Sequence, residues 1–175
     1  MNVREIADRL DIEALLLRYG RALDTRDSEL LESCFSADAV LEYDAAGPAT
    51  RAQFVERAKG LAKFTVTQHV VTNISVRLDG DHARATSYAH AQHVRGEAGG
   101  RETYLMGGTY TDDLERTPQG WRISRRRFAC GWAAKRFDVL ADPSVETMPM
   151  IILLSDWWSC SHEAGRPHMD WTSKS

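Results

Sequence analysis

The chain has 175 residues and a mass of 19.7 kDa, which fits one domain large enough to bury a core and an internal pocket. Its formal net charge is −3, and acidic and basic residues are mixed along its length. The basic run at residues 125–127 is short. This distribution lacks the electrostatic footprint of a protein that binds nucleic acid or an anionic membrane, so we expect neither partner.

The cysteines and the apolar stretches indicate the compartment. Cys34, Cys130 and Cys160 are widely spaced and form no Cys-x-x-Cys pair, so neither a disulfide framework nor a zinc knuckle is predicted. The first residues run into charged helical sequence, and the longest apolar stretch, residues 148–154, is too short to span a bilayer. We therefore expect reduced thiols in a cytoplasmic protein.

Two helices are expected near the N-terminus. Over about residues 11–24, apolar side chains recur at three-to-four spacing behind Asp11, a good N-cap, which predicts an amphipathic helix. These side chains are Ile12, Leu15, Leu16, Tyr19 and Leu23. A second, short helix is expected to start at Asp27 or Ser28 and to end before Ser36.

The pattern then changes towards strands. Residues 39–43 are typical of a strand, and Thr50 and Gln53 match a capping box that starts a third helix. From residue 64 the apolar positions lie mostly two apart, which predicts a long strand ending at the turn of residues 79–81. Glycine-containing turns separate three further expected strands, at residues 83–95, 101–116 and 121–132.

Helices followed by hairpin-connected strands are an α+β order. This order predicts a strongly curved antiparallel or mixed sheet wrapped around the N-terminal helices, with an internal pocket. We expect residues 1–135 to form this domain. Residues 136–175 hold three prolines and three tryptophans, so we expect a C-terminal extension with a short helix and an irregular tail, covering the pocket mouth or a subunit boundary.

Asp24 and His69 carry the strongest chemical signal. Asp24 ends the first helix, where a carboxylate meets the negative end of the helix dipole and needs a partner; otherwise it is a solvated acid or a cap. His69 shares a strand face with Thr67, so it lines a polar pocket or faces water, unless a bulge re-aims the strand. The opposite face carries Val66, Val70 and Ile74. A carboxylate that orients a neutral histidine makes a general base, which favours a lyase or isomerase.

A second histidine is a candidate for the same site. His90 and His93 lie an odd number of positions apart, so a regular strand sends at most one of them into a shared site. His93 shares its face with the small residues Ser87, Ala89 and Ala91, which leave room for a ligand; otherwise it is a surface histidine. Asp24, His69 and His93 could hold a divalent metal, but no metal-binding motif supports this, and a metal-free base is preferred.

Other candidates lie on the strands and on the first helix. An inward-facing Arg126 would stabilise negative charge on an enolate or leaving group, and a solvated arginine is the other interpretation. Its expected strand face also carries Phe128, Cys130 and Trp132. Tyr19 and Tyr43 either donate hydrogen bonds to a substrate oxygen or simply pack. The pair Gly107 and Gly108 predicts a bend or a place where a ligand meets the backbone.

Five motifs, in this order, resemble the SnoaL-like branch of the NTF2-like superfamily over about residues 5–135. They are the Tyr-x4-Asp helix end at Tyr19, Ala-Asp-Ala-Val-x-x-Tyr at Ala37, Thr67-Gln-His69, Gly107-Gly-Thr-Tyr-Thr111 and Gly120-Trp-Arg-Ile-Ser124. Within the superfamily the pattern is similar to scytalone dehydratase and hexachlorocyclohexane dehydrochlorinase, with the bile-acid 7α-dehydratases nearby.

The resemblance implies a cone-shaped α+β fold with a deep apolar pocket and an Asp-His dyad that works without a cofactor. Asp24 matches the acid of the dyad and His69 its general base. His93 matches a second histidine that helps the departing hydroxyl. Tyr43 matches a tyrosine that polarises the substrate oxygen through water, and Arg126 matches an arginine that assists a leaving chloride.

Departures from the pattern narrow the expected reaction. Tyr19 stands where the dehydrochlorinase pattern has a lysine, and the serine and asparagine of scytalone dehydratase have no clear counterpart near residues 106–109. We expect a carbon-oxygen lyase acting on a cyclic, largely apolar hydroxy-ketone of the polyketide, terpenoid or steroid type. The expected substrate contacts are Tyr19, Tyr43, Phe128 and Trp132. An isomerase or cyclase, a dehydrochlorinase and a non-catalytic small-molecule-binding module are the alternatives, and related proteins imply a homo-oligomer, either a dimer or a trimer.

Overall fold

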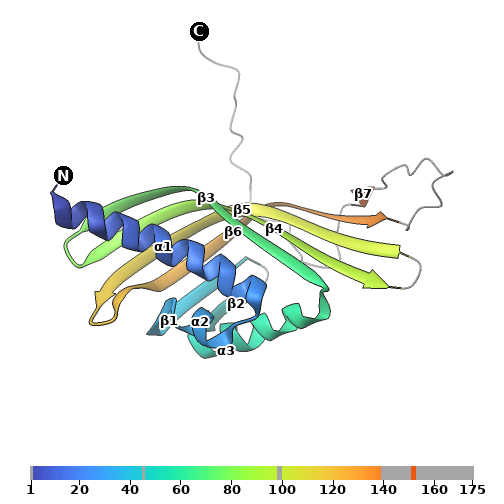
Figure 1. The fold of residues 1–175 in the computed structure, drawn as a ribbon, viewed down its shortest axis with the longest axis horizontal. Coiled ribbons are helices and arrows are strands. Elements are labelled where there is room, and N and C mark those ends of the chain that lie inside the picture. The colour runs from blue at the N-terminus through green and yellow to red at the C-terminus, as the bar shows by residue number, and fades with distance from the viewer. Residues whose placement is uncertain (1, 45, 98–99, 139–150, 153–175) are drawn as a thin grey trace, which may run out of the picture.

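The computed structural model describes residues 2–44, 46–97, 100–138 and 151–152. The helical elements are α1 (Val3–Thr25), α2 (Ser28–Glu32), α3 (Arg51–Ala58) and the 3₁₀ helix η1 (Lys59–Lys63). In Figure 1, α1 lies along one face of a curved sheet, and the shorter helices gather beyond its C-terminal end. None of the helices in these ranges is long and apolar enough to span a membrane.

The strands form one mixed sheet in the described part of the chain, in the order β2-β1-β6-β5-β4-β3, with β7 paired to β6. They are β1 (Phe35–Tyr43), β2 (Gly47–Thr50), β3 (Val66–Asp79), β4 (His82–Glu97), β5 (Gly100–Thr117), β6 (Gly120–Asp138) and β7 (Ile151–Ile152). β1 runs parallel to β6, and every other pairing is antiparallel. The expected α+β fold with a long antiparallel meander is confirmed.

The first helix is longer than its apolar pattern predicts. It starts at Val3, because the Asn2 side chain and the Glu5 side chain cap each other's backbone N–H groups. Its first turns are held to the sheet by polar contacts: buried Asp8 pairs with Arg116 at 2.6 Å and accepts a hydrogen bond from the Trp121 indole at 3.2 Å. The expected start at Asp11 was wrong because an ion pair, rather than apolar periodicity, anchors this end.

The second helix and the first strand meet earlier than expected. Asp27 caps α2 by accepting a hydrogen bond from the Leu30 N–H at 2.9 Å, as predicted. The helix ends at Glu32, and β1 already begins at Phe35, which pairs with Ile123 of β6. The capping box of Thr50 and Gln53 at the start of α3 is confirmed, whereas β2 just before it was not predicted.

A bulge in β3 decides which residues of this strand face the helices. The pairing with β4 shifts between Thr72 and Ser75, and Asn73 takes a left-handed backbone conformation with φ of 53°. Before the bulge the odd-numbered residues, including His69, face inward; after it Ile74 faces inward and packs against the core. The expectation that His69 and Ile74 lie on opposite faces was therefore wrong.

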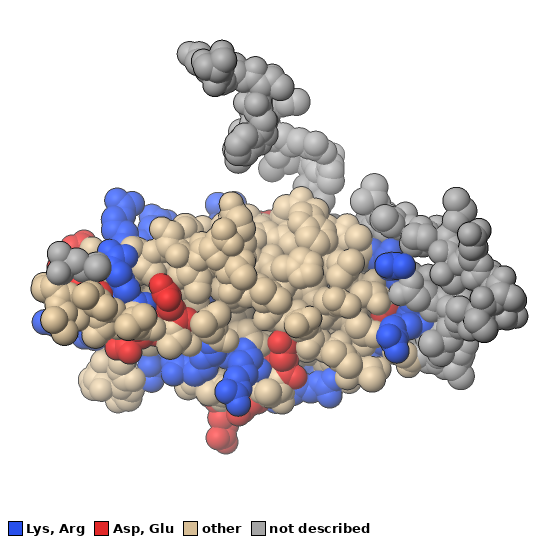
Figure 2. Space-filling view, turned by 45° about the horizontal axis from the view of Figure 1, so that its top comes forward, with Lys and Arg blue, Asp and Glu red and all other residues tan. Residues whose placement is uncertain are grey.

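The core lies between α1 and the inner face of the sheet. Fully buried apolar side chains come from both layers, namely Ile12, Leu15, Leu16, Leu41, Leu114 and Ile123. The outer face of the sheet instead exposes Val66, Val70, Tyr88 and Trp132. Figure 2 shows few charged side chains over the middle of the sheet and more of them around its edges. Except for residues 136–138 and 151–152, the expected C-terminal extension lies outside the described residues.

Candidate active site

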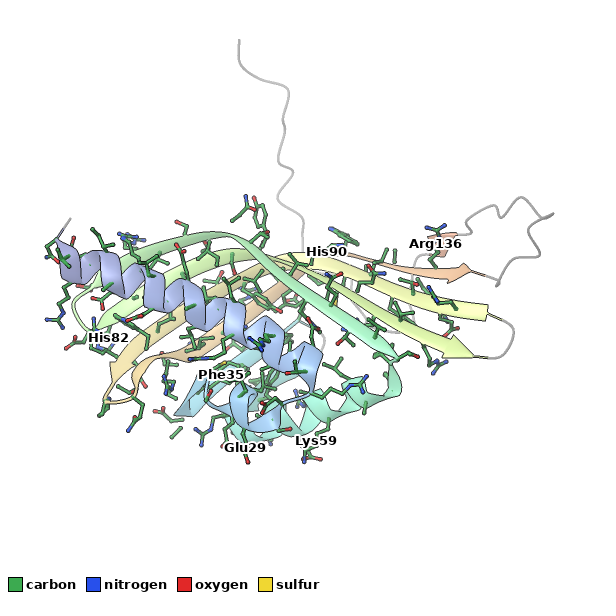
Figure 3. The ribbon with its side chains drawn as sticks, in the orientation of Figure 1. Glu29, Phe35, Lys59, His82, His90 and Arg136 are labelled. Atoms are coloured by element: carbon green, nitrogen blue, oxygen red, sulfur yellow. The ribbon has the colours of Figure 1, made fainter. Side chains whose placement is uncertain are left out.

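A cavity of about 240 Å³ lies between α1, α3, η1 and the inner face of the sheet. Much of its wall is apolar, with Leu23, Phe54, Phe64, Ala91, Met106 and Phe128. Its polar groups are His69, His93, Tyr19, Tyr43, Tyr110, Arg57 and Lys63. Figure 3 shows Phe35 in the space between the sheet and the helices, and His90 on the other side of the sheet.

Asp24 and His69 form a direct pair at one side of this cavity. His69 Nδ1 lies 2.7 Å from Asp24 Oδ1, and Asp24 Oδ2 accepts the backbone N–H of His69 at 2.9 Å. The Thr67 hydroxyl donates to Asp24 Oδ1 at 3.0 Å. The carboxylate at the end of α1 thus has the partners that its position requires, and they come from one short stretch of β3.

The close approach of α1 to β3 depends on Gly20. A Cβ at this position would lie 3.0 Å from the backbone oxygen of His69. Gly20 precedes Asp24 by about one helical turn, so the same face of α1 provides both the space and the carboxylate. A side chain at this position would push the histidine strand away from the acid.

The hydrogen bonds to Asp24 determine the ionisation state of its carboxyl and the tautomer of His69. Burial tends to raise the pKa of the Asp24 carboxyl, but the bonds from His69 and Thr67 outweigh it and leave the pKa below its ordinary value. Asp24 is therefore ionised at neutral pH and accepts the proton of His69 Nδ1. The unprotonated nitrogen of a neutral His69 is then Nε2, which is the atom a base requires.

The second histidine of the site is His93, and His90 is excluded from it. His93 Nε2 lies 3.3 Å from His69 Nε2, and the His93 ring packs against Phe64 with 4.9 Å between ring centroids. Burial, with a smaller effect of the His69 charge, lowers the pKa of His93 to about 4. His93 is therefore neutral at pH 7. As predicted, its strand face is shared with the buried residues Ser87, Ala89 and Ala91.

Three tyrosines line another part of the cavity wall. The hydroxyls of Tyr19 and Tyr43 are hydrogen-bonded at 2.7 Å, and the rings of Tyr19 and Tyr110 meet edge to face. Burial raises the pKa of Tyr19, Tyr43 and Tyr110 well above the ordinary value. The hydroxyls stay protonated at neutral pH and can donate hydrogen bonds to a substrate oxygen.

Arg126 faces inward rather than into solvent, which was one of the two interpretations of the sequence. It does not line the cavity. It is fully buried and forms two parallel hydrogen bonds to Asp112, at 2.7 and 2.8 Å. Its guanidinium carbon lies 4.1 Å from the ring centroids of both Tyr19 and Tyr110. The expected direct contact of Arg126 with a leaving group is not supported by this placement; the residue lies behind the tyrosines.

Of the two aromatic residues expected on β6, only Phe128 lines the cavity. Gly108 pairs with Cys130 and Gly107 with Trp132, so β6 has one extra residue, Gly131, between them. This bulge turns Trp132 to the outer face, where it is 49% exposed and its ring centroid lies 5.5 Å from that of His90. The expectation that Trp132 shares a strand face with Arg126 and Phe128 was wrong, and Trp132 does not line this cavity.

The glycine pair Gly107 and Gly108 makes room for aromatic rings rather than for a ligand. A Cβ on Gly107 would meet the Trp132 ring at 2.4 Å, and one on Gly108 would meet the Phe128 ring at 2.7 Å and the Ala129 carbonyl oxygen at 2.3 Å. The expected bend is present as the register shift beside these glycines.

Several residues of the site were not predicted. Asp112 could have been noticed as a charged residue within the alternation of Tyr110 and Leu114, which are both buried. Phe64, Arg57 and Lys63 have no comparable signal, because α3 and η1 bring them to the cavity. Within the described ranges, no group of three His, Cys, Asp or Glu side chains is placed to hold a metal ion.

Sequence comparison identifies the family. The sequence model of the SnoaL-like domain matches residues 4–127. The chain belongs to the SnoaL-like domain family. The uncharacterized protein Rv2910c of Mycobacterium tuberculosis is 39% identical over 133 residues, which cover 72% of this chain and 87% of that protein. The resemblance to the SnoaL-like branch of the NTF2-like superfamily is thus confirmed.

Solved structures share the fold. A proposed scytalone dehydratase from Novosphingobium aromaticivorans has a TM-score of 0.68 and 23% identity, covering 76% of this chain and 90% of its own. A hexachlorocyclohexane dehydrochlorinase, LinA type 2, has a TM-score of 0.65 and 19% identity, covering 81% of this chain and 97% of its own. The NTF2-like fold is therefore one that enzymes use.

Proposed function

We propose that this SnoaL-like protein is a cofactor-independent carbon-oxygen lyase of the dehydratase type, acting on a cyclic, largely apolar hydroxy-ketone. The observation that carries the proposal is the 2.7 Å pair of Asp24 and His69 beside a mostly apolar cavity. The carboxylate holds the imidazole in one tautomer and stabilises the imidazolium that forms when His69 accepts a proton. A base of this kind suits proton abstraction next to a carbonyl.

In the proposed reaction, His69 Nε2 takes the proton from the carbon next to the carbonyl. The C–H bonding electrons move to the carbonyl oxygen as an enolate. When the enolate collapses, a carbon-carbon double bond forms and the bond to the hydroxyl one carbon further on breaks. The hydroxide accepts the proton held by His69 and leaves as water, so the histidine returns to its neutral state.

The hydroxyls of Tyr19 and Tyr43 would stabilise the enolate. Donors already in place in a mostly apolar cavity are more effective than solvent at the moment when the charge develops. The buried Arg126 holds its charge against the Tyr19 ring and fixes the ring position. We assign it to support of the tyrosines rather than to contact with the departing group.

His93 has a different role from the one expected. With a pKa of about 4, it holds no excess proton at pH 7 and is a poor source of one for the leaving hydroxyl. Its Nε2–H instead donates towards His69 Nε2 in the free protein. We propose that this N–H turns to the leaving hydroxyl once substrate enters, and that the proton in the released water comes from His69.

The test is turnover of a panel of cyclic hydroxy-ketones, followed by mass spectrometry for the loss of one water. We expect loss of product formation in His69→Gln and Asp24→Asn while both variants stay folded by circular dichroism. Full turnover in His69→Gln would contradict the proposal. A product of unchanged mass that still requires His69 would instead identify an isomerase or cyclase, which uses the same first step.

A non-catalytic binding module is the second candidate. It is favoured by the 3.3 Å contact with His93, which occupies the base nitrogen of His69 in the free protein. Tight binding of a small molecule without turnover, unchanged in Asp24→Asn, would support this alternative. The cytoplasmic location and the homo-oligomeric state stay predictions.

A further inference from the structure

We propose that Thr67 is a positioning residue of the dyad, and that its hydroxyl holds the Asp24 carboxylate in the orientation that fixes the His69 imidazole. The proposal rests on the proposed function, because it gives Thr67 a part in the reaction of the same dyad. It starts from the hydroxyl, which lies 3.0 Å from Asp24 Oδ1, the oxygen that also pairs with His69 Nδ1 at 2.7 Å. An ionised carboxylate only accepts hydrogen bonds, so the hydroxyl is the donor.

The orientation of the Asp24 carboxylate has to be set from outside the residue. The last side-chain torsion of an aspartate joins an sp³ carbon to an sp² carbon, and its broad preference selects no single orientation. Asp24 Oδ2 accepts the backbone N–H of His69 at 2.9 Å, and Oδ1 accepts from the imidazole and from Thr67. Of these three donors, only the Thr67 hydroxyl comes from outside His69. It therefore fixes Oδ1 independently of the ring that Oδ1 must orient.

The contact between α1 and the start of β3 does not depend on this hydroxyl. Arg26, the residue after α1, donates a hydrogen bond to the Phe64 carbonyl just before β3. The backbone of Thr67 lies opposite His93 in the register of β3 and β4. The helix, the strand and the second histidine are therefore held by other contacts, and the Thr67 hydroxyl adds the position of the carboxylate oxygen.

Thr67 acts without touching the substrate. It is not among the described residues that line the cavity, whereas His69, two positions along the same face of β3, lines it. The Asp24 side chain is 26% exposed, so water competes with the imidazole for Oδ1. A threonine is stiff at its first side-chain torsion, so its hydroxyl occupies one acceptor position of this oxygen and leaves the other to the imidazole. The effect of Thr67 should therefore be on kcat rather than on KM.

Three variants separate the hydroxyl from the shape of the side chain. Thr67→Val keeps the branched shape and removes the donor, whereas Thr67→Ser keeps the donor and removes the methyl group. Thr72→Val makes the same chemical change at an exposed position of the same strand, on the outer face, and is the matched control. Circular dichroism checks that each variant is folded.

The experiment measures two quantities. The first is kcat and KM on a hydroxy-ketone from the panel, and the second is the rate at which the His69 Nδ1 proton exchanges with water, by NMR of the labelled imidazole. In Thr67→Val we expect kcat to fall about tenfold, the effect of one hydrogen bond to a charged group, and KM to stay within a factor of about two. The Nδ1 proton should exchange several-fold faster, because a carboxylate that turns more freely holds it less well. Thr67→Ser and Thr72→Val should stay within a factor of about two of wild type, because both keep the donor to Asp24.

The proposal is overturned if Thr67→Val keeps the wild-type kcat or the wild-type exchange rate. A loss in Thr67→Ser as large as in Thr67→Val would assign the effect to packing of the methyl group, and an equal loss in Thr72→Val would assign it to the strand as a whole.

The exchange rate needs no substrate, so the positioning role and the lyase fail separately. If wild type dehydrates a hydroxy-ketone and Thr67→Val is equally active, the assignment of Thr67 fails and the lyase stands. If wild type dehydrates none of the panel, the lyase fails, and the exchange rates alone decide whether Thr67 positions the dyad.

Discussion

Two of the acid-base pairs between α1 and the sheet differ in almost every physical respect. Asp112 and Arg126 are fully buried, joined by two hydrogen bonds, and absent from the cavity wall. The Asp24 side chain is 26% exposed, and its partner His69 opens into the cavity. Arginine stays charged at any physiological pH, whereas histidine can gain and lose a proton. The comparison teaches that a buried permanent pair holds the tyrosines in place, and that the partly exposed titratable pair beside the cavity is the one available for chemistry.

The largest expected effect is on the buried pair. Asp112→Asn leaves the Arg126 charge in the core without its carboxylate, and breaking a buried pair in this way costs about 3–5 kcal/mol of stability. Urea denaturation should show a correspondingly lower midpoint. Asp24→Asn should lose much less, because its carboxylate is partly in water. Equal destabilisation by the two variants would remove the distinction between the pairs.

The pH dependence of stability should come next in size. The pKa of His93 is about 4 in the folded protein and about 6.5 when unfolded, so the unfolded chain takes up a proton first as the pH falls. His93 contributes nothing above pH 6.5 and destabilises the fold progressively down to about pH 4, by up to about 3 kcal/mol. Denaturation of wild type and His93→Phe between pH 4 and 7 checks this. A slope that persists in His93→Phe would assign it to other groups.

The pair of Asp24 and His69 should control activity. Asp24→Asn keeps the shape of the side chain but removes the charge that orients His69 and stabilises its imidazolium. We expect kcat to fall about 100-fold, as for loss of general base assistance, with a small change in KM. Steady-state kinetics on a substrate from the hydroxy-ketone panel measures this. A fall in Asp112→Asn at a temperature where it is fully folded, as large as in Asp24→Asn, would contradict the assignment of the two roles.

The smallest expected effect concerns the spacing between α1 and β3. In Gly20→Ala the new methyl group meets the His69 backbone oxygen at 3.0 Å, so β3 must shift by a few tenths of an ångström. Activity should fall several-fold, since a small misplacement of a catalytic group is costly. A Gly107→Ala variant is not a suitable control, because its Cβ would meet the Trp132 ring. Trp132→Ala on the outer face is a suitable control, and it should leave kcat unchanged. A Gly20→Ala enzyme as active as wild type would show that the dyad tolerates a wider gap.

Much of the fold could be predicted because the apolar spacing changes from three or four residues to two along the chain. The capping residues Asp27 and Thr50 identified the starts of two helices. The helix-end position of Asp24 indicated only that its carboxylate needs a partner, and the pairing with His69 was predicted from the resemblance to the SnoaL-like family. The start of α1 was missed, because the ion pair of Asp8 with Arg116 joins residues far apart in the sequence.

The errors within the strands share one cause. A bulge moves every following side chain to the other face. The sequence around Asn73 and the sequence around Gly131 do not predict the bulges found there. The first bulge places His69 and Ile74 on the same side, and the second removes Trp132 from the cavity. Register between strands depends on contacts between distant residues, so alternation alone predicts a face only up to the next bulge.

The most direct test of the central claim is the tautomer of His69, measured by two-bond ¹⁵N–¹H correlation NMR of the labelled imidazole at pH 7.5. The structure predicts a proton on Nδ1, held by Asp24, and an unprotonated Nε2 facing the cavity. In Asp24→Asn the preference for Nδ1–H should be lost or reduced. A proton on Nε2 in the wild-type protein would contradict the account, because the nitrogen that must accept the substrate proton would already carry one.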